Sequence, residues 1–243
     1  MATLPIDLSD RAALQPLARL LAAVRQGAGD TPVLLVGAAA RDVLLVHLHG
    51  VPLLRATEDT DVAVAVRDWD RFLALRQSLI DSRLFRPEGP PHRLYFGSHR
   101  LDIIPFGGVE RGDRRIEWPI GGLEVMSVWG FSEALVSALA VQLPGEEAVL
   151  VASLPALALL KLWAWEDRRY LTRKDASDLW LLLRCYADAG NQDRLFGPEG
   201  EAALASFSYD LEMAGAWLLG HDAAGCCRTE ASWTSRFRTF RAS

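Results

Sequence analysis

The chain has 243 residues, of which 50% are hydrophobic and 23% are charged, a composition typical of folded globular proteins rather than disordered chains. Its formal net charge of −5 excludes a global positive field for nucleic acid, so any such binding must be local. The 3 cysteines are an odd number and two are adjacent, which favours a reducing compartment. Because no apolar run reaches the roughly 20 residues of a membrane span and no basic leader is visible, we expect a cytoplasmic protein without a membrane partner.

The first half of the chain alternates helical and extended patterns. Leucines at helical spacing after Ser9 predict an N-capped amphipathic helix that ends at the turn of residues 27–30. An apolar run over 33–37 predicts a strand that ends on glycine, followed by a helix over 38–49. The further predictions are strands over 60–66, 93–97, 100–106 and 114–118, and a helix over 68–80.

The second half of the chain is predicted to be mainly helical. The expected elements are helices over 131–140, 154–168 and 173–187, a strand over 148–151, and two or three shorter helices within 201–240. Ser153 is the expected N-cap of the helix over 154–168. With a boundary near Glu124, we predict a core domain over 1–124 and a mainly helical region over 125–243 that covers its cleft.

Three carboxylates stand out within the predicted strands. Asp59 and Asp61 are two residues apart and therefore share one face of a strand, and Asp102 interrupts a later apolar strand. If these strands are neighbours, the three like charges converge, and such a cluster persists only when cations neutralise it. Magnesium takes oxygen ligands, and two such ions clamp the attacking and leaving oxygens of a phosphoryl displacement. The pattern therefore indicates nucleotidyl transfer.

A glycine turn supplies a second motif. Gly37 follows the strand over 33–36, and glycine lets the backbone approach a ligand while the free amides of the next helix hold phosphate oxygens. On its own, a glycine after a strand usually marks only a turn. Together with the three carboxylates it indicates a triphosphate site.

These motifs resemble those of the nucleotidyltransferase superfamily, in which a hydrophobic residue, a glycine and a small residue precede an Asp-x-Asp strand and a later third acid. Within it, the chain resembles the AbiEii-like nucleotidyltransferases, many of which are toxins of type IV toxin–antitoxin pairs. The matching stretches are 37–42, 57–61, 101–107, 160–165 and 173–179. The resemblance implies an α+β fold, with a nucleotidyltransferase-like mixed sheet flanked by helices and followed by a mainly helical C-terminal region.

The resemblance also implies roles for individual residues. Asp59 and Asp61 would bind two Mg²⁺ ions, or Mn²⁺, together with the nucleoside triphosphate. Asp102 would complete the second metal site and help to deprotonate the acceptor hydroxyl. Gly37 and Ala38 would meet the phosphates, although Ala38 lacks the hydroxyl that a serine at this position offers.

Two lysines and two motif residues complete the predicted nucleotide site. The chain has 24 arginines but only two lysines, Lys161 and Lys174, and a site that needs a compact ammonium cannot accept a forked guanidinium. Lys161 also matches a lysine that resembling proteins place near the triphosphate. We assign both lysines to nucleotide binding, with a solvated helix face as the alternative for each. Thr57 and Arg41 are assigned there too, with an ion pair as the alternative for Arg41.

Other residues keep two interpretations. Asp175 and Asp178 share a helical face and either support Lys161 or serve as capping or surface residues. Trp163 and Trp165 lie on different helical faces, so at most one stacks on a base, and core packing is the alternative for either. The arginines at 93, 100, 111, 114 and 115 form either a local basic patch or rim ion pairs.

The leading hypothesis is a magnesium-dependent nucleotidyltransferase, in which an acceptor hydroxyl attacks the α-phosphorus of a nucleoside triphosphate and pyrophosphate leaves. The acceptor stays open between transfer RNA, a protein side chain and a small molecule such as an aminoglycoside. The alternatives are a metal-dependent phosphohydrolase and a non-catalytic nucleotide- or partner-binding protein with a degenerate nucleotidyltransferase fold. The toxin resemblance implies a cognate antitoxin protein as a partner.

Overall fold

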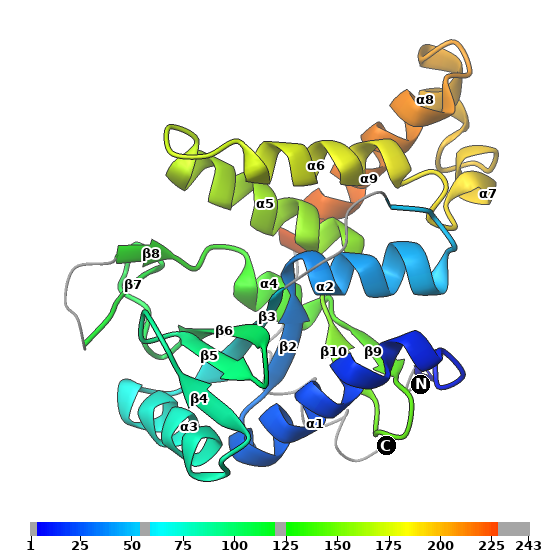
Figure 1. The fold of residues 1–243 in the computed structure, drawn as a ribbon. Helices are drawn as coiled ribbons and strands as arrows, with labels where there is room; N and C mark the ends of the chain where they lie inside the picture. The colour runs from blue at the N-terminus through cyan, green and yellow to red at the C-terminus, as the bar shows by residue number, and fades with distance from the viewer. Residues whose placement is uncertain (1–3, 54–58, 120–124, 228–243) are drawn as a thin grey trace.

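The computed structural model describes residues 4–53, 59–119 and 125–227 (Figure 1). The strands are β1 (Ile6–Asp7), β2 (Val33–Val36), β3 (Asp59–Val66), β4 (Phe85–Pro87), β5 (Arg93–Phe96), β6 (His99–Gly107), β7 (Arg115–Glu117), β8 (Val125–Ser127), β9 (Leu139–Gln142) and β10 (Val149–Val151). Within these ranges, eight strands form one mixed sheet in the order β1-β9-β10-β2-β3-β6-β5-β4, and β7 pairs with β8 separately. The mixed sheet and its flanking helices confirm the predicted fold class.

The helices gather in two groups. They are α1 (Gln15–Ala28), α2 (Gly37–Asp42), α3 (Trp69–Asp81), α4 (Phe131–Val136), α5 (Leu154–Arg168), α6 (Lys174–Cys185), α7 (Gln192–Leu195), α8 (Glu201–Ser206) and α9 (Leu211–Cys227), with a π-helical segment over Val43–Leu48. In Figure 1, α1 and α3 lie side by side next to the sheet, and α5, α6 and α9 pack together in a separate layer above it. In the described part of the chain, no helix combines the length and hydropathy needed to span a bilayer.

The centre of the sheet positions the candidate site. β3 pairs with β2 in antiparallel and with β6 in parallel orientation, and its residues Val62, Ala63 and Val64 are fully buried. Such a strand reads as a nearly continuous apolar run because both of its faces are covered. The register places Asp61 opposite Val36 on one side and opposite Asp102 on the other. The end of β2 and the two acids therefore meet at one place.

Local sequence explains the start of α5, which forms the other wall of the site. The Ser153 side chain accepts a hydrogen bond from the Ala156 backbone N–H at 3.4 Å, and a proline occupies the first turn. Both features favour a helix N-terminus at this point. The predicted helix over 154–168 is confirmed at both ends.

The structure corrects three element predictions. Ser9 does not cap a helix: its N–H donates to Asp7 Oδ1 at 2.9 Å, and α1 begins only at Gln15, where Pro16 suits a first turn. The predicted helix over 131–140 ends at Val136, because residues 139–142 form β9 between β1 and β10. The helix over Leu211–Cys227 is a single long element rather than one of several short helices.

The mixed sheet also continues beyond residue 124. β9 and β10 lie in the region that the sequence assigns to the second domain, and they join the sheet beside β2. The division into 1–124 and 125–243 stays a prediction.

Candidate active site

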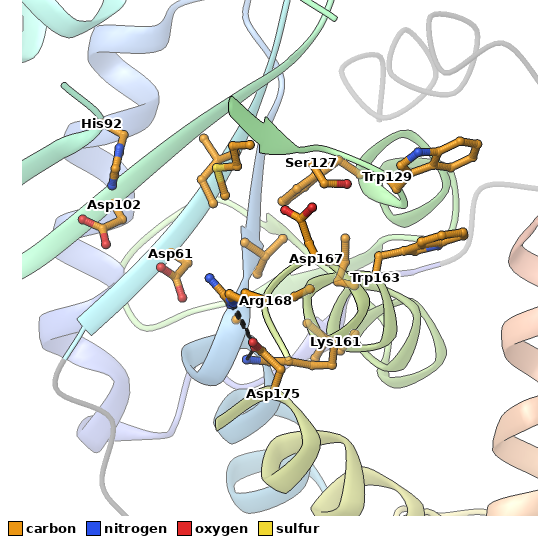
Figure 2. Close-up of a pocket in the computed structure, with 18 of the residues that line it drawn as sticks. Asp61, His92, Asp102, Ser127, Trp129, Lys161, Trp163, Asp167, Arg168 and Asp175 are labelled. Carbon is orange, nitrogen blue, oxygen red and sulfur yellow. Dashed lines mark hydrogen bonds and ion pairs between the residues drawn. The ribbon is translucent and has the colours of Figure 1, made fainter. Parts of the chain in front are cut away.

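A cavity of about 280 Å³ lies between the central strands and α5 (Figure 2). Gly37, Asp61, Arg93 and Asp102 line the cavity on the side of the sheet, which we call the sheet wall. Lys161, Trp163, Arg168 and Asp175 line it on the side of α5 and α6, which we call the helix wall. The volume is close to the lower end of the range of ligand sites. Segments far apart in the sequence therefore enclose one pocket, in which charged and apolar side chains both take part.

Within the described ranges, Asp61 is the carboxylate of this cavity without a hydrogen-bond or ion-pair partner. It makes no hydrogen bond or ion pair with any residue that the structure describes, and it faces Asp102 across the β3–β6 pairing. Burial and, next, the charge of Asp102 raise the pKa of Asp61, while the charges of Lys161, Lys174 and Arg168 lower it. A half-buried carboxylate held beside the buried Asp102 is costly unless a cation joins it.

Asp102 has a cationic partner already. Arg93 Nε lies 2.8 Å from Asp102 Oδ1 and Arg93 Nη2 lies 2.9 Å from Oδ2, a forked pair across the β5–β6 hairpin. The hydrogen bond to Asp102 raises the pKa of Arg93. An ionised carboxylate has about four lone-pair sites, and Arg93 uses two of them. The Asp102 oxygens therefore retain lone pairs for a metal ion.

Asp59 is placed apart from the other two acids. It lies opposite Arg100 in the β3–β6 register, forms an ion pair with that residue, and is not among the residues that line the cavity. The structure thus brings Asp61 and Asp102 together and holds Asp59 two residues away on the same strand face.

Gly37 is required by its close approach to Asp61. Its φ of 66° is left-handed, and a Cβ at this position would overlap the Asp61 carboxylate. Ala38 is half-buried and does not line the cavity. Thr57, the remaining predicted contact in this part of the chain, lies outside the described residues.

The helix wall presents cations that are already paired. Lys161 Nζ lies 2.6 Å from Asp178 Oδ2 and 3.3 Å from Asp175 Oδ1. Arg168 forks onto the fully buried Asp175, with Nε–Oδ2 and Nη2–Oδ1 distances of 2.6 and 2.9 Å. Burial alone would raise the pKa of Asp175, but Arg168 and Lys161 lower it. Asp175 and Asp178 therefore hold Lys161 in position, as one of the two sequence interpretations proposed.

Arg41 and Lys174 do not reach the cavity. Arg41 is buried, with Nη2 at 2.7 Å from Asp42 Oδ1 and Nη1 at 3.2 Å from Asp178 Oδ1, so the structure shows the ion-pair alternative. Lys174 is exposed and is not among the lining residues. Of the predicted nucleotide contacts, the cavity brings together Gly37 and Lys161.

Sequence reasoning did not assign Arg168 or Trp129 to the site, and it named Arg93 only as part of a basic patch or as a rim ion pair. Arg168 follows Lys161 by seven residues, which is two helical turns, so this spacing could have placed both on one face. Arg93 could have been paired with Asp102 from the predicted hairpin, because Phe96 opposite His99 sets Arg93 opposite Asp102. No comparable pattern marks Trp129, which lies between β8 and α4.

The charges of the cavity favour added cations. Among the described residues, its lining holds the carboxylates Asp61, Asp102, Asp167 and Asp175 and the cations Arg93, Lys161 and Arg168, which leaves one net negative charge. A polyanionic triphosphate would be repelled from such a lining unless metal ions accompany it. Oxygen donors of this kind suit hard divalent ions.

A second cluster of metal-ligand residue types lies elsewhere. Ligand atoms of Glu199, His221 and Asp222 lie within 4.8 Å of one another. Arg194 already occupies both acids of this cluster, with ion pairs of 2.6 Å to Glu199 and 2.8 Å to Asp222. We therefore place the candidate metal site at Asp61 and Asp102.

Comparison with solved structures finds chains of low similarity. The solution structure of the antibiotic-resistance factor ANT(2'')-Ia is 15% identical, with a TM-score of 0.42 over 79% of this chain and 91% of that one. The crystal structure of ANT(2'')-Ia in complex with adenylyl-2''-tobramycin is 15% identical, with a TM-score of 0.44 over 80% of this chain and 99% of that one. The E. coli MS115-1 CdnC:HORMA-deltaN complex gives 20% identity and a TM-score of 0.26 over 83% and 64%.

No curated protein matches the chain. A family model does match: that of the nucleotidyl transferase AbiEii toxin of type IV toxin–antitoxin systems covers residues 19–212. This span includes the glycine turn, Asp61 and Asp102 of the sheet wall, and the whole helix wall. The chain therefore belongs to the AbiEii family and is a nucleotidyltransferase.

Proposed function

We propose that the protein transfers a nucleoside monophosphate from a nucleoside triphosphate to an acceptor hydroxyl with the help of Mg²⁺, with Mn²⁺ as a substitute. The observation that carries the proposal is Asp61: it lies beside Asp102, has no described partner, and shares a cavity with Lys161 and Arg168. Asp61 and Asp102 would hold the metal, and Asp59 would join them as the third carboxylate when Arg100 releases it.

The donor set fits two divalent ions. Bound there, the ions would polarise the reacting phosphate and stabilise the leaving pyrophosphate. The net negative charge of the lining supports this assignment, because the paired cations of the helix wall do not by themselves outnumber the carboxylates.

The chain's own residues would orient the triphosphate and move the proton. Lys161 and Arg168 would contact the phosphates from the helix wall, and Gly37 would let the backbone approach from the sheet wall. Asp102 would accept the proton of the acceptor hydroxyl, whose oxygen then bonds the α-phosphorus as the bond to the β-phosphate oxygen breaks. Arg93 would keep Asp102 oriented. Arg41 would not touch the nucleotide but would hold Asp178, which in turn pairs with Lys161.

The proposed transfer is tested with nucleoside triphosphates that carry a label on either the α- or the γ-phosphate. The protein is incubated with Mg²⁺ and each nucleoside triphosphate labelled at the α- or γ-phosphate, with cellular RNA, cellular protein or aminoglycosides as acceptors. We expect α-label in one acceptor class, no γ-label there, and loss of labelling in Asp61→Asn but not in Asp70→Asn, a change of an exposed acid on α3. Free phosphate without incorporation would instead indicate a phosphohydrolase, and binding without turnover a non-catalytic protein.

Family membership supports a biological role as a toxin neutralised by a cognate antitoxin. If this role is correct, expression of the chain alone slows growth and Asp61→Asn relieves the effect at equal protein level. Equal growth arrest by both proteins would separate toxicity from nucleotidyl transfer.

A further inference from the structure

Two tryptophans form an unusual stack at one end of the cavity. The rings of Trp129 and Trp163 have centroids 5.0 Å apart and an interplanar angle of 22°. Both line the cavity, and they are 38% and 37% exposed, whereas the core residue Trp118 is 3% exposed. Figure 2 shows the two indoles at the opposite end of the cavity from Asp61 and Asp102. Core packing does not account for this exposure.

Arg114 holds the stack from the side of β7. Its guanidinium lies over the Trp129 ring, 4.6 Å from the centroid, and pairs with Glu133 through Nη1 and Nη2 at 2.6 and 2.9 Å. The Arg114 carbonyl accepts a hydrogen bond of 2.9 Å from the Val128 N–H. Arg114 also adopts a φ of 55°, a conformation that costs a non-glycine residue about 1 kcal/mol or more. A strained residue thus contacts the Trp129 ring through its side chain and the preceding residue, Val128, through its backbone.

Gly130 brings the stack against α5. Its φ is 89°, and a Cβ at this position would lie 3.1 Å from Leu160 Cδ2 and 3.7 Å from Trp163 Cδ1. A side chain here would therefore push the loop away from the helix. The stack is pre-organised, and Trp163 has one stacked ring partner among the described residues while Trp129 has a ring and a guanidinium.

The position of Trp163 on α5 suggests its ligand. Trp163 follows Lys161 by two residues, so the two side chains leave the helix in directions about 200° apart. Both nevertheless line the same cavity. A ligand that fills this cavity can therefore stack on Trp163 and place an anion at Lys161. Aromatic platforms beside cationic side chains are typical of sites that bind nucleobases.

We infer that Trp163, supported by Trp129 and Arg114, is the stacking surface for the base of the nucleoside triphosphate. This inference rests on the proposed function. Because every base has a π-face, such a surface adds affinity without selecting strongly among the four bases. Arg114 and Glu133 then act as positioning residues.

The test compares a ligand that has a base with one that lacks it. Binding of ATP and of inorganic tripolyphosphate, each with Mg²⁺, is measured by calorimetry for the wild type, Trp163→Ala and Trp163→Phe. We expect Trp163→Ala to weaken ATP binding by roughly 5- to 100-fold and tripolyphosphate binding by less than about 2-fold, while Trp163→Phe retains most of the ATP affinity. The matched control is Trp180→Ala, which removes a tryptophan that is 58% exposed on α6 and also faces an arginine.

Each other outcome has a separate meaning. Equal weakening of both ligands by Trp163→Ala would show a collapsed cavity and overturn the inference, as would unchanged ATP affinity. A raised KM for the acceptor with unchanged ATP affinity would assign the platform to the acceptor instead. A wild type that binds neither ligand would overturn the proposed function itself.

Discussion

Asp175 on the helix wall and Asp61 on the sheet wall of the cavity differ in whether a cation of the protein pairs with them. On the helix wall, the buried Asp175 has two cationic partners, Arg168 and Lys161. On the sheet wall, Asp61 has none among the described residues, and its pKa is raised by burial and by Asp102. Since uncompensated buried charge destabilises a fold, the sheet wall is built for a cation that arrives with the ligand. On the helix wall, ion pairs with Asp175 and Asp178 already hold Lys161 and Arg168 in position.

The substitution with the largest expected effect removes the charge of Asp61. Asp61→Asn should lower nucleotidyl transfer by about 10³-fold or more, because stabilisation by bound metal amounts to several kcal/mol and each 1.36 kcal/mol is a factor of ten. The same change should not lower the free energy of unfolding in the absence of metal, since it removes an unpaired charge. Initial rates and urea denaturation measure the two effects, and a clear loss of stability would contradict the contrast.

Loss of the Asp175 charge, unlike loss of the Asp61 charge, should lower the free energy of unfolding. Asp175→Asn removes the shared partner of Arg168 and Lys161, and we expect the free energy of unfolding to fall by about 1–2 kcal/mol. This is less than for a fully buried pair because Arg168 is half-exposed and water screens its charge. Urea denaturation at neutral pH measures the loss, and Asp193→Asn, at an exposed acid of α7, provides the control.

The two lysines offer a matched comparison on the helix wall. Lys161→Met should raise the KM for nucleoside triphosphate by about 10-fold, as expected for one lost charge-assisted contact. Lys174→Met should change it by less than about 2-fold, because Lys174 is exposed and does not line the cavity. If both changes raised the KM by the same factor, the KM would depend on the net charge of the helices and not on a contact made by Lys161.

The smallest effect is a pH dependence of the Asp175 contribution. Its pKa is lowered in the folded protein, so the unfolded chain binds more protons as the pH falls below the ordinary aspartate range. The stabilisation is therefore complete above the unfolded pKa and is lost as the pH falls through the folded one. Urea denaturation should show an unchanged gap between wild type and Asp175→Asn from about pH 7 to about pH 5, and a gap that shrinks as the pH falls below about 4. A gap that stays the same below about pH 4 would contradict this origin.

The sequence allowed much of the sheet wall to be predicted, because its elements follow simple local patterns. The alternation in 60–66 and the apolar run in 33–37 identified β3 and β2, and glycine at the end of β2 marked the turn. Only the three-dimensional register shows that Asp61 lies opposite Asp102 while Asp59 lies opposite Arg100. Pairing between strands about forty residues apart depends on the packing of the whole sheet.

The helix wall was harder to predict because its contacts cross between elements. The start of α5 followed from Ser153 and Pro155, but periodicity alone gave two interpretations for Asp175 and for Trp163. Trp129 could not be found, since its position depends on a left-handed residue, Arg114, in another segment. Local patterns carry no information about such long-range support.

The central claim is that Asp61 and Asp102 bind the metal that brings the triphosphate to Lys161 and Arg168. Its most direct test is calorimetric titration with an α,β-methylene nucleoside triphosphate, in Mg²⁺ and in EDTA, for the wild type and Asp61→Asn. We predict that wild-type affinity falls by about 100-fold or more in EDTA, and that Asp61→Asn binds equally weakly in both. Wild-type binding that is equally tight with and without Mg²⁺ would contradict the account.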